Sequence, residues 1–136
     1  EGQAKAGVLE ALDLIEARGL KIGLATSSPF TMVEAVLGKL GIRDRFMAVH
    51  SAEVERFGKP HPDVYIHAAE KLGVEPVHCL AIEDSFTGLL AAKAASMKAL
   101  IVPDPALVGD PRLAIADHQL HSLAELDADM LARWVA

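Results

Sequence analysis

The sequence has a single cysteine, Cys79, and this scarcity excludes a disulfide bond within the chain. No uninterrupted apolar run is long enough to span a membrane, although 51% of the 136 residues are hydrophobic. The 13 Lys and Arg residues are scattered singly and outnumbered by 19 Asp and Glu residues, so the basic face that nucleic acids require is missing. We therefore expect a soluble globular protein that has neither nucleic acid nor membrane as a partner.

A secretory signal pattern is also missing, and together with the lone cysteine this indicates a cytoplasmic location. Cys79 lies in an apolar run and is expected to be an inert core residue. The six histidines show no metal-ligand spacing and are expected to be surface or packing residues. The chain opens with Glu1 rather than Met, and its first residues resemble the middle of a domain, so we expect a fragment of a longer protein. The oligomeric state is not predicted.

Apolar residues recur at helical spacing in some segments and form short unbroken runs in others. The expected helices cover residues 7–18, 29–40, 62–72 and 86–95, and a last helix begins at its cap, Ser122, and ends near Trp134. The expected strands cover residues 21–25, 46–50, 78–82 and 98–102, with a short extra strand at 118–121. Between the last two strands, residues 104–117 are Pro-rich and irregular.

Short apolar strands that alternate with helices are typical of a parallel sheet whose two faces are covered by helices. We therefore predict one α/β domain over residues 1–136, with a three-layer Rossmann-like arrangement. In such sheets, ligands bind outside the carboxyl ends of the strands. Thr26 and the pair Glu83-Asp84 are expected at such ends, and Lys59 lies in the loop that follows another strand.

The segment Thr26-Ser27-Ser28-Pro29 follows one expected strand and begins a helix. Ser28 can cap this helix, and Pro29 suits its first position. The hydroxyl group of Thr26 and the first N–H groups of the helix can together bind an anion. Thr26 and Ser27 are therefore candidate phosphate ligands, while an ordinary helix cap remains the alternative.

The segment Lys59-Pro60-His61-Pro62 contains two prolines that fix the backbone around the lysine and begin the next helix. This rigidity would aim the Lys59 side chain, whose ammonium group can hold phosphate oxygens. A solvated loop lysine is the alternative, and His61 is expected to be exposed. Lys59 is therefore a candidate catalytic and substrate-binding residue.

Glu83 and Asp84 follow a buried strand, where adjacent carboxylates repel each other unless a cation or N–H groups compensate. Mg²⁺ prefers a few carboxylates together with water and phosphate oxygens, so this pair is a candidate magnesium site. The alternative is that Asp84 or Ser85 caps the next helix and that Gly88 lets this helix pack closely. No Asp-x-Asp stretch lies upstream, so the pocket has no evident nucleophile.

In this order, GLATSSP, GKPHPD and AIEDSFTG resemble the second, third and fourth motifs of the haloacid dehalogenase-like hydrolases, in the subgroup of beta-phosphoglucomutase and small sugar phosphatases. The closing stretch VPDPALVGDPRLAIAD is similar to bacterial hexitol and 2-deoxyglucose 6-phosphate phosphatases. The resemblance implies that Thr26 and Lys59 are catalytic and that Glu83 and Asp84 hold Mg²⁺. Ser28-Pro29-Phe30 stands where mutases carry a further polar phosphate contact, which disfavours a mutase.

Family members open with an Asp-x-Asp-Gly strand that carries the nucleophile and lies mid-sheet, and a substrate-selecting cap follows it. This chain starts after both, so we expect the C-terminal part of the core domain, with two half-sheets flanking the missing strand. The resemblance implies a Mg²⁺-dependent phosphatase of small phosphorylated sugars or polyols, acting through an aspartyl-phosphate intermediate. A non-catalytic phosphate- or partner-binding module of the same fold is the alternative, and a dehalogenase is a third, less favoured one.

Overall fold

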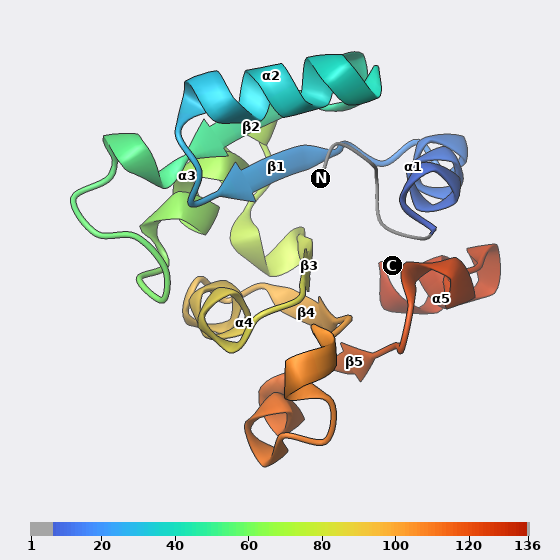
Figure 1. The fold of residues 1–136 in the computed structure, drawn as a ribbon. Helices are drawn as coiled ribbons and strands as arrows, with labels where there is room; N and C mark the ends of the chain where they lie inside the picture. The colour runs from blue at the N-terminus through green and yellow to red at the C-terminus, as the bar shows by residue number, and fades with distance from the viewer. Residues whose placement is uncertain (1–6, 136) are drawn as a thin grey trace.

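The computed structural model describes residues 7–135 and shows the expected alternation of helices and strands (Figure 1). The helices are α1 (Val8–Ala17), α2 (Phe30–Leu40), α3 (Asp63–Leu72), α4 (Phe86–Ala94) and α5 (Ala128–Trp134). The strands are β1 (Gly23–Thr26), β2 (Ala48–Ser51), β3 (Leu80–Glu83), β4 (Lys98–Ile101) and β5 (His118–Gln119). Within the described range, none of the helices combines the length and the apolar character needed to cross a bilayer.

All strand pairs are parallel, and the strands form two separate sheets. In the first sheet β1 pairs with β2, so that Thr26 lies opposite Ser51. In the second sheet β4 lies between β3 and β5, and Glu83 lies opposite Ile101. The predicted α/β architecture with parallel strands is confirmed, and it takes the form of the two expected half-sheets. Strands β1 and β3 each have a strand partner on one side only among the described residues.

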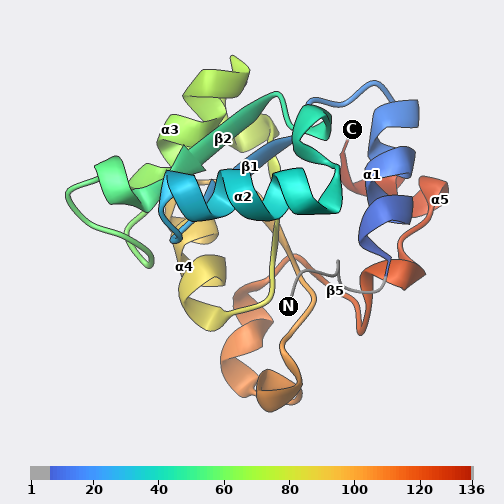
Figure 2. The ribbon, with the colours of Figure 1, turned by 45° about the horizontal axis from the view of Figure 1, so that its top comes forward.

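Helices cover both faces of the strands. Successive β4 residues point to opposite faces. On one face, α3 and α4 enclose the fully buried Ile101 together with Val64 and Leu89. On the other face, α1 and α5 pack around the fully buried Leu100. The α2 residue Val33 packs in a further cluster with α1 and β2. Figure 2 shows α2 and α3 on opposite sides of β1 and β2.

The start of α2 differs from the prediction. Its N-cap is Pro29, and the Ser28 side chain makes no capping hydrogen bond. Instead, the N–H group of Phe30 donates to Oε1 of Glu53, at 2.6 Å. The Glu53 carboxylate, from the turn after β2, therefore accepts from one of the N–H groups that were expected to be available to an anion.

Two expectations near other element ends were also wrong. Ser122 caps a short 3₁₀ turn (Leu123–Glu125), and Asp127 caps α5 through a bond to the Met130 N–H group. Cys79 precedes β3 rather than lying within a buried strand, and it is only partly buried. Strands β1, β2 and β3 each begin two residues later than expected, whereas β4 and β5 begin at the expected residues.

Candidate active site

The predicted site residues gather at the carboxyl ends of β1 and β3. Thr26 is the last residue of β1, Glu83 is the last residue of β3, and Asp84 follows it directly. Lys59 reaches this edge from the loop between β2 and α3. The predicted positions of Thr26, Glu83 and Asp84 at or directly after the carboxyl ends of strands are therefore observed.

Lys59 connects the two sheets. Its Nζ atom lies 2.6 Å from Oε2 of Glu83 at the end of β3, and it donates to the carbonyl oxygen of Ala25 in β1, at 3.2 Å. The Lys59 side chain is 13% exposed and that of Glu83 is 8% exposed. These contacts rule out the alternative of a solvated loop lysine.

Tyr65 completes the surroundings of Glu83. Its hydroxyl group donates a hydrogen bond to Oε2 of Glu83, and its ring centroid lies 5.1 Å from Nζ of Lys59. Burial of the phenol raises the pKa of Tyr65 far above its ordinary value, and the negative charges of Glu83 and Asp84 raise it further. Tyr65 therefore stays protonated and remains a donor. The sequence analysis missed this residue, although it is the only tyrosine and lies in the first turn of the helix after Lys59.

Gly88 makes room for the Glu83 carboxylate. A Cβ atom at position 88 would lie 2.0 Å from Oε1 of Glu83 and 2.2 Å from its Cδ, which is closer than real atoms approach. The N–H group of Gly88 donates to Oγ of Ser85, at 3.1 Å, so Ser85 is the N-cap of α4. The expected close packing at Gly88 is thus confirmed, and Asp84 is not needed as the cap.

Thr26 is oriented by its own turn. Its Oγ1 atom accepts from the N–H group of Ser28, at 3.0 Å, which leaves the hydroxyl proton available to a ligand. The carbonyl oxygen of Ser28 in turn accepts from Oγ of the fully buried Ser51, at 2.6 Å. Ser51 was not singled out from the sequence, where nothing distinguishes it from other serines. Ser27 is exposed beside this turn.

The acidic pair offers oxygen donors to a metal. Asp84 is exposed, whereas Glu83 is buried and shares one oxygen with both Lys59 and Tyr65. An oxygen-only donor set with room for water fits Mg²⁺. The structure therefore distinguishes the two carboxylates, because Asp84 is exposed and Glu83 is buried beside Lys59.

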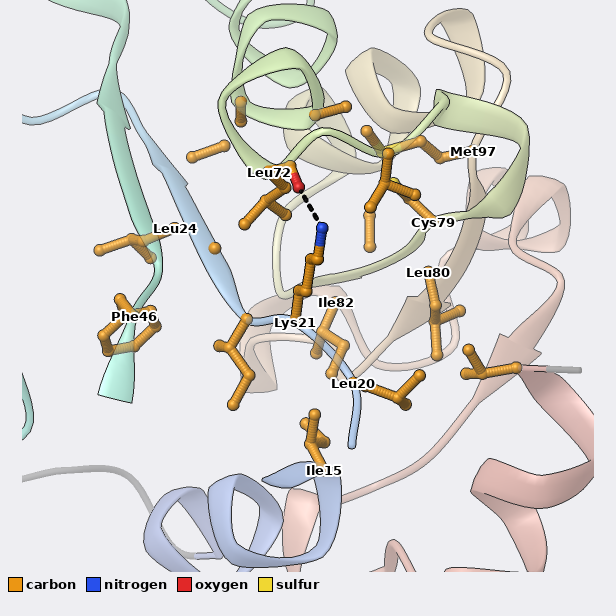
Figure 3. A pocket seen from close by; sticks show the side chains of 18 of the residues that line it. Ile15, Leu20, Lys21, Leu24, Phe46, Leu72, Cys79, Leu80, Ile82 and Met97 are labelled. Carbon is orange, nitrogen blue, oxygen red and sulfur yellow. Dashed lines mark hydrogen bonds between the residues drawn. The ribbon is translucent and has the colours of Figure 1, made fainter. Parts of the chain in front are cut away.

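A cavity of about 550 Å³ separates β1 from β3 (Figure 3). Apolar side chains from both strands and from the segments around them line it, among them Leu24, Phe46, Leu80 and Ile82. Ile82 is 37% exposed although it lies within a strand. The cavity thus lies where a mid-sheet strand was expected. The contacts of Lys59 lie near the carboxyl ends of the two strands that border it, β1 and β3.

Comparison with known proteins places these features in a family. The family model for haloacid dehalogenase-like hydrolases matches residues 1–96. Hexitol phosphatase B of Escherichia coli is 49% identical over 122 residues, which are 90% of this chain and 55% of that protein. Beta-phosphoglucomutase of Bacillus subtilis is 35% identical, over 92% of this chain and 52% of that protein.

Among solved structures, CbbY of Rhodobacter sphaeroides in complex with phosphate superimposes with a TM-score of 0.82 at 30% identity, covering 90% of this chain and 55% of that one. The chain thus spans about half the length of the relatives that it matches. The match includes the segments that contain Thr26, Lys59 and Glu83. The chain belongs to the haloacid dehalogenase-like hydrolases.

Proposed function

We propose that the complete protein is a Mg²⁺-dependent phosphatase of small phosphorylated sugars or polyols. The observation that carries this proposal is the position of Lys59, whose ammonium group is buried at the carboxyl edge between Ala25 and Glu83. The similarity to hexitol phosphatase B supports a polyol phosphate as the substrate, and the phosphate complex of CbbY supports a phosphate site in this fold.

Two side chains would hold the phosphoryl group. An ammonium group has three N–H donors, and Lys59 uses two of them on Ala25 and Glu83, so a third can reach a phosphate oxygen. The hydroxyl group of Thr26 can donate to another oxygen, with Ser27 beside it. Donors that are fixed before the substrate arrives stabilise the charge of a transferring phosphoryl group at little reorganisation cost.

Asp84 and Glu83 would hold Mg²⁺, with Asp84 as a direct ligand and Glu83 acting directly or through a metal-bound water. The bound metal supplies positive charge that neutralises the phosphate oxygens. By pairing with Glu83, Lys59 compensates part of the negative charge of the acidic pair while no metal is bound.

The nucleophile would be an aspartate on a strand that fills the cavity between β1 and β3, and the reaction would pass through an aspartyl phosphate. An extended strand suits this place, because among the described residues β1 and β3 both have unpaired edges there, and the lining is mostly apolar. The carboxyl end of such a strand would lie beside Lys59 and Thr26, where the phosphoryl group would be held.

The test is hydrolysis by the complete protein of a panel of hexitol, pentose and hexose phosphates, with Mg²⁺ and with excess EDTA. We expect turnover that requires Mg²⁺ and is highest for one of the polyol or sugar phosphates. Binding of inorganic phosphate with no turnover of any phosphate ester would instead establish a non-catalytic binding module.

A further inference from the structure

A second cluster of polar side chains lies away from the Lys59 edge. It consists of His50 in β2, Glu55 in the following loop and His67 in α3. Nε2 of His50 and Nδ1 of His67 each lie 2.5 Å from the same atom, Oε2 of Glu55. All three donor atoms lie within 4.8 Å of one another. Two imidazole nitrogens and one carboxylate oxygen thus converge on one point.

The histidines had been expected to be surface or packing residues, because their spacing in the sequence shows no ligand pattern. His50 is buried and His67 is partly exposed, as expected, but the structure brings these two histidines together. His50 is 5% exposed, and the fold brings it next to His67 although 16 residues separate them in the chain. Their rings meet edge to face, with centroids 5.8 Å apart. The convergence comes from tertiary structure, since β2 and α3 pack side by side.

We propose that His50, Glu55 and His67 form a site for a divalent transition-metal ion of the Zn²⁺ class. Two imidazoles and a carboxylate, with a fourth position left to water, form a common donor set for this ion. Imidazole nitrogen distinguishes the site chemically from the oxygen donors Glu83 and Asp84, which suit Mg²⁺. The proposal does not depend on the phosphatase activity.

The geometry fits the ion after a small expansion. Tetrahedral Zn²⁺ with bonds near 2.1 Å holds its ligand atoms roughly 3.4 Å apart, so the distance from each imidazole nitrogen to the Glu55 oxygen would grow by about 0.9 Å. The His67 side chain is 41% exposed and can adjust most readily, whereas the side chains of His50 and Glu55 are each 6% exposed. The exposed side of His67 also gives the ion a route from solvent.

The affinity is expected to be moderate. Binding through Nε2 leaves the His50 proton on Nδ1, and this atom is buried with no hydrogen-bond partner among the described residues. Metal-bound histidines usually donate this second N–H group, and losing such support weakens metal binding about 10- to 100-fold. The site therefore resembles a reversible site more than a permanent structural one.

A bound ion would fix the loop that leads to Lys59. The three ligands come from β2, from the loop and from α3, and Lys59 lies four residues after Glu55 in the same loop. In Figure 2 this segment joins β2 to α3 at the left of the molecule. The ion would therefore stabilise the folded state by an amount that grows with the logarithm of its concentration relative to its dissociation constant.

The experiment is a titration of the complete protein with Zn²⁺, followed by calorimetry and by competition with a colorimetric chelator. It uses Asp84→Asn as the background, so that the proposed magnesium site cannot account for the binding. We expect one Zn²⁺ per chain, a rise in the unfolding midpoint on adding Zn²⁺, and an at least tenfold loss of affinity in His67→Gln and in Glu55→Gln. Binding of Co²⁺ should give the visible absorption of a tetrahedral complex.

The matched control is His121→Gln, which removes an 82% exposed histidine outside the cluster and should keep the parent affinity. His67→Gln alters a partly exposed helix residue, so its fold should survive, and circular dichroism would check this. Equal Zn²⁺ affinity in the parent, His67→Gln and Glu55→Gln would overturn the proposal. The absence of a bound ion in the parent would also overturn it, and the three side chains would then be joined by hydrogen bonds alone.

Discussion

Lys59 and Glu83 form a buried ion pair that joins the two sheets, with Nζ and Oε2 2.6 Å apart. The lysine comes from the loop after β2 and the glutamate from the end of β3, so the contact spans the gap between β1 and β3. Tyr65 donates to the same carboxylate oxygen. This arrangement gives Lys59 a structural role as well as the proposed catalytic one.

The first prediction separates these two roles. Lys59→Met in the complete protein should lower the free energy of unfolding by about 3–5 kcal/mol, because it leaves Glu83 buried without its counter-charge. Turnover should fall at least about tenfold, since a charge-assisted phosphate contact worth roughly 1.5–3 kcal/mol is lost. Urea unfolding and steady-state kinetics measure the two effects.

The double variant Lys59→Met/Glu83→Gln is the control for this prediction. It also removes the unpaired negative charge of Glu83, so most of the lost stability should return while turnover stays low. If Lys59→Met alone were as stable as the parent, the pair would not be buried in solution as the structure has it.

The second prediction concerns the space beside Glu83. Gly88→Ala would place a Cβ atom 2.0 Å from Oε1 of Glu83, so the carboxylate must move away from Lys59. We expect a loss of stability of about 1–3 kcal/mol from overpacking, together with weaker Mg²⁺-dependent activity. Thermal unfolding and kinetics would detect both.

Gly38→Ala is the matched control, because Gly38 lies in α2 and a Cβ atom there would meet nothing within 4 Å. It should be neutral or stabilising by up to about 1 kcal/mol. Comparable losses in both glycine variants would show that the contact with Glu83 is not the cause.

The third prediction is a pH dependence of stability. The hydrogen bond to Glu55 raises the pKa of His67 above its ordinary value of 6.5, and the charges of Glu55, Glu70 and Asp63 add to this. The hydrogen bond from His50 lowers the pKa of Glu55 below 4.5, so Glu55 stays ionised above that pH. A raised folded-state pKa contributes stability that is full below pH 6.5 and is lost as pH rises through the folded-state pKa.

Metal-free protein should therefore lose stability relative to His67→Gln as pH rises from 6 to 8.5. Urea unfolding at several pH values in the presence of a chelator measures this difference. The parent and His67→Gln would show parallel pH profiles if the Glu55 contact did not persist in solution.

Much of the fold and part of the site could be predicted from the sequence. Apolar runs alternating with helical stripes predicted the parallel strands, and the positions of Thr26 and Glu83 at the carboxyl ends of two strands were also predicted. The burial of Lys59 could not be predicted from the sequence, because it depends on Glu83, a partner 24 residues away. Local patterns cannot reveal such contacts, since they arise only when separate strands pack.

The same reasoning explains the other misses. The convergence of His50, Glu55 and His67 depends on the packing of α3 against β2, and no local spacing encodes it. Ser28 is a good cap by residue type, but Glu53 from a neighbouring loop reaches the Phe30 N–H group instead. Residue preferences therefore predicted the ends of elements less well than they predicted the elements themselves.

The fourth prediction concerns the cavity between the sheets. Residues 1–136 produced alone should associate or unfold without cooperativity, because within residues 7–135 β1 and β3 present unpaired edges beside an apolar cavity of about 550 Å³. No phosphatase activity is expected from this segment even with Mg²⁺. Sedimentation velocity and urea unfolding test the first part, and a monomer with a single sharp transition would contradict it.

The most direct test of the proposed magnesium-dependent site is the Mg²⁺ dependence of turnover in Asp84→Asn, measured on the best phosphate ester of the complete protein. The substitution keeps the shape of the exposed side chain and removes its charge, so half-maximal activity should require at least tenfold more Mg²⁺. Asp129→Asn, at an 80% exposed aspartate in α5, should keep the parent dependence. An unchanged Mg²⁺ requirement in Asp84→Asn would contradict the assignment of this edge as the metal and phosphate site.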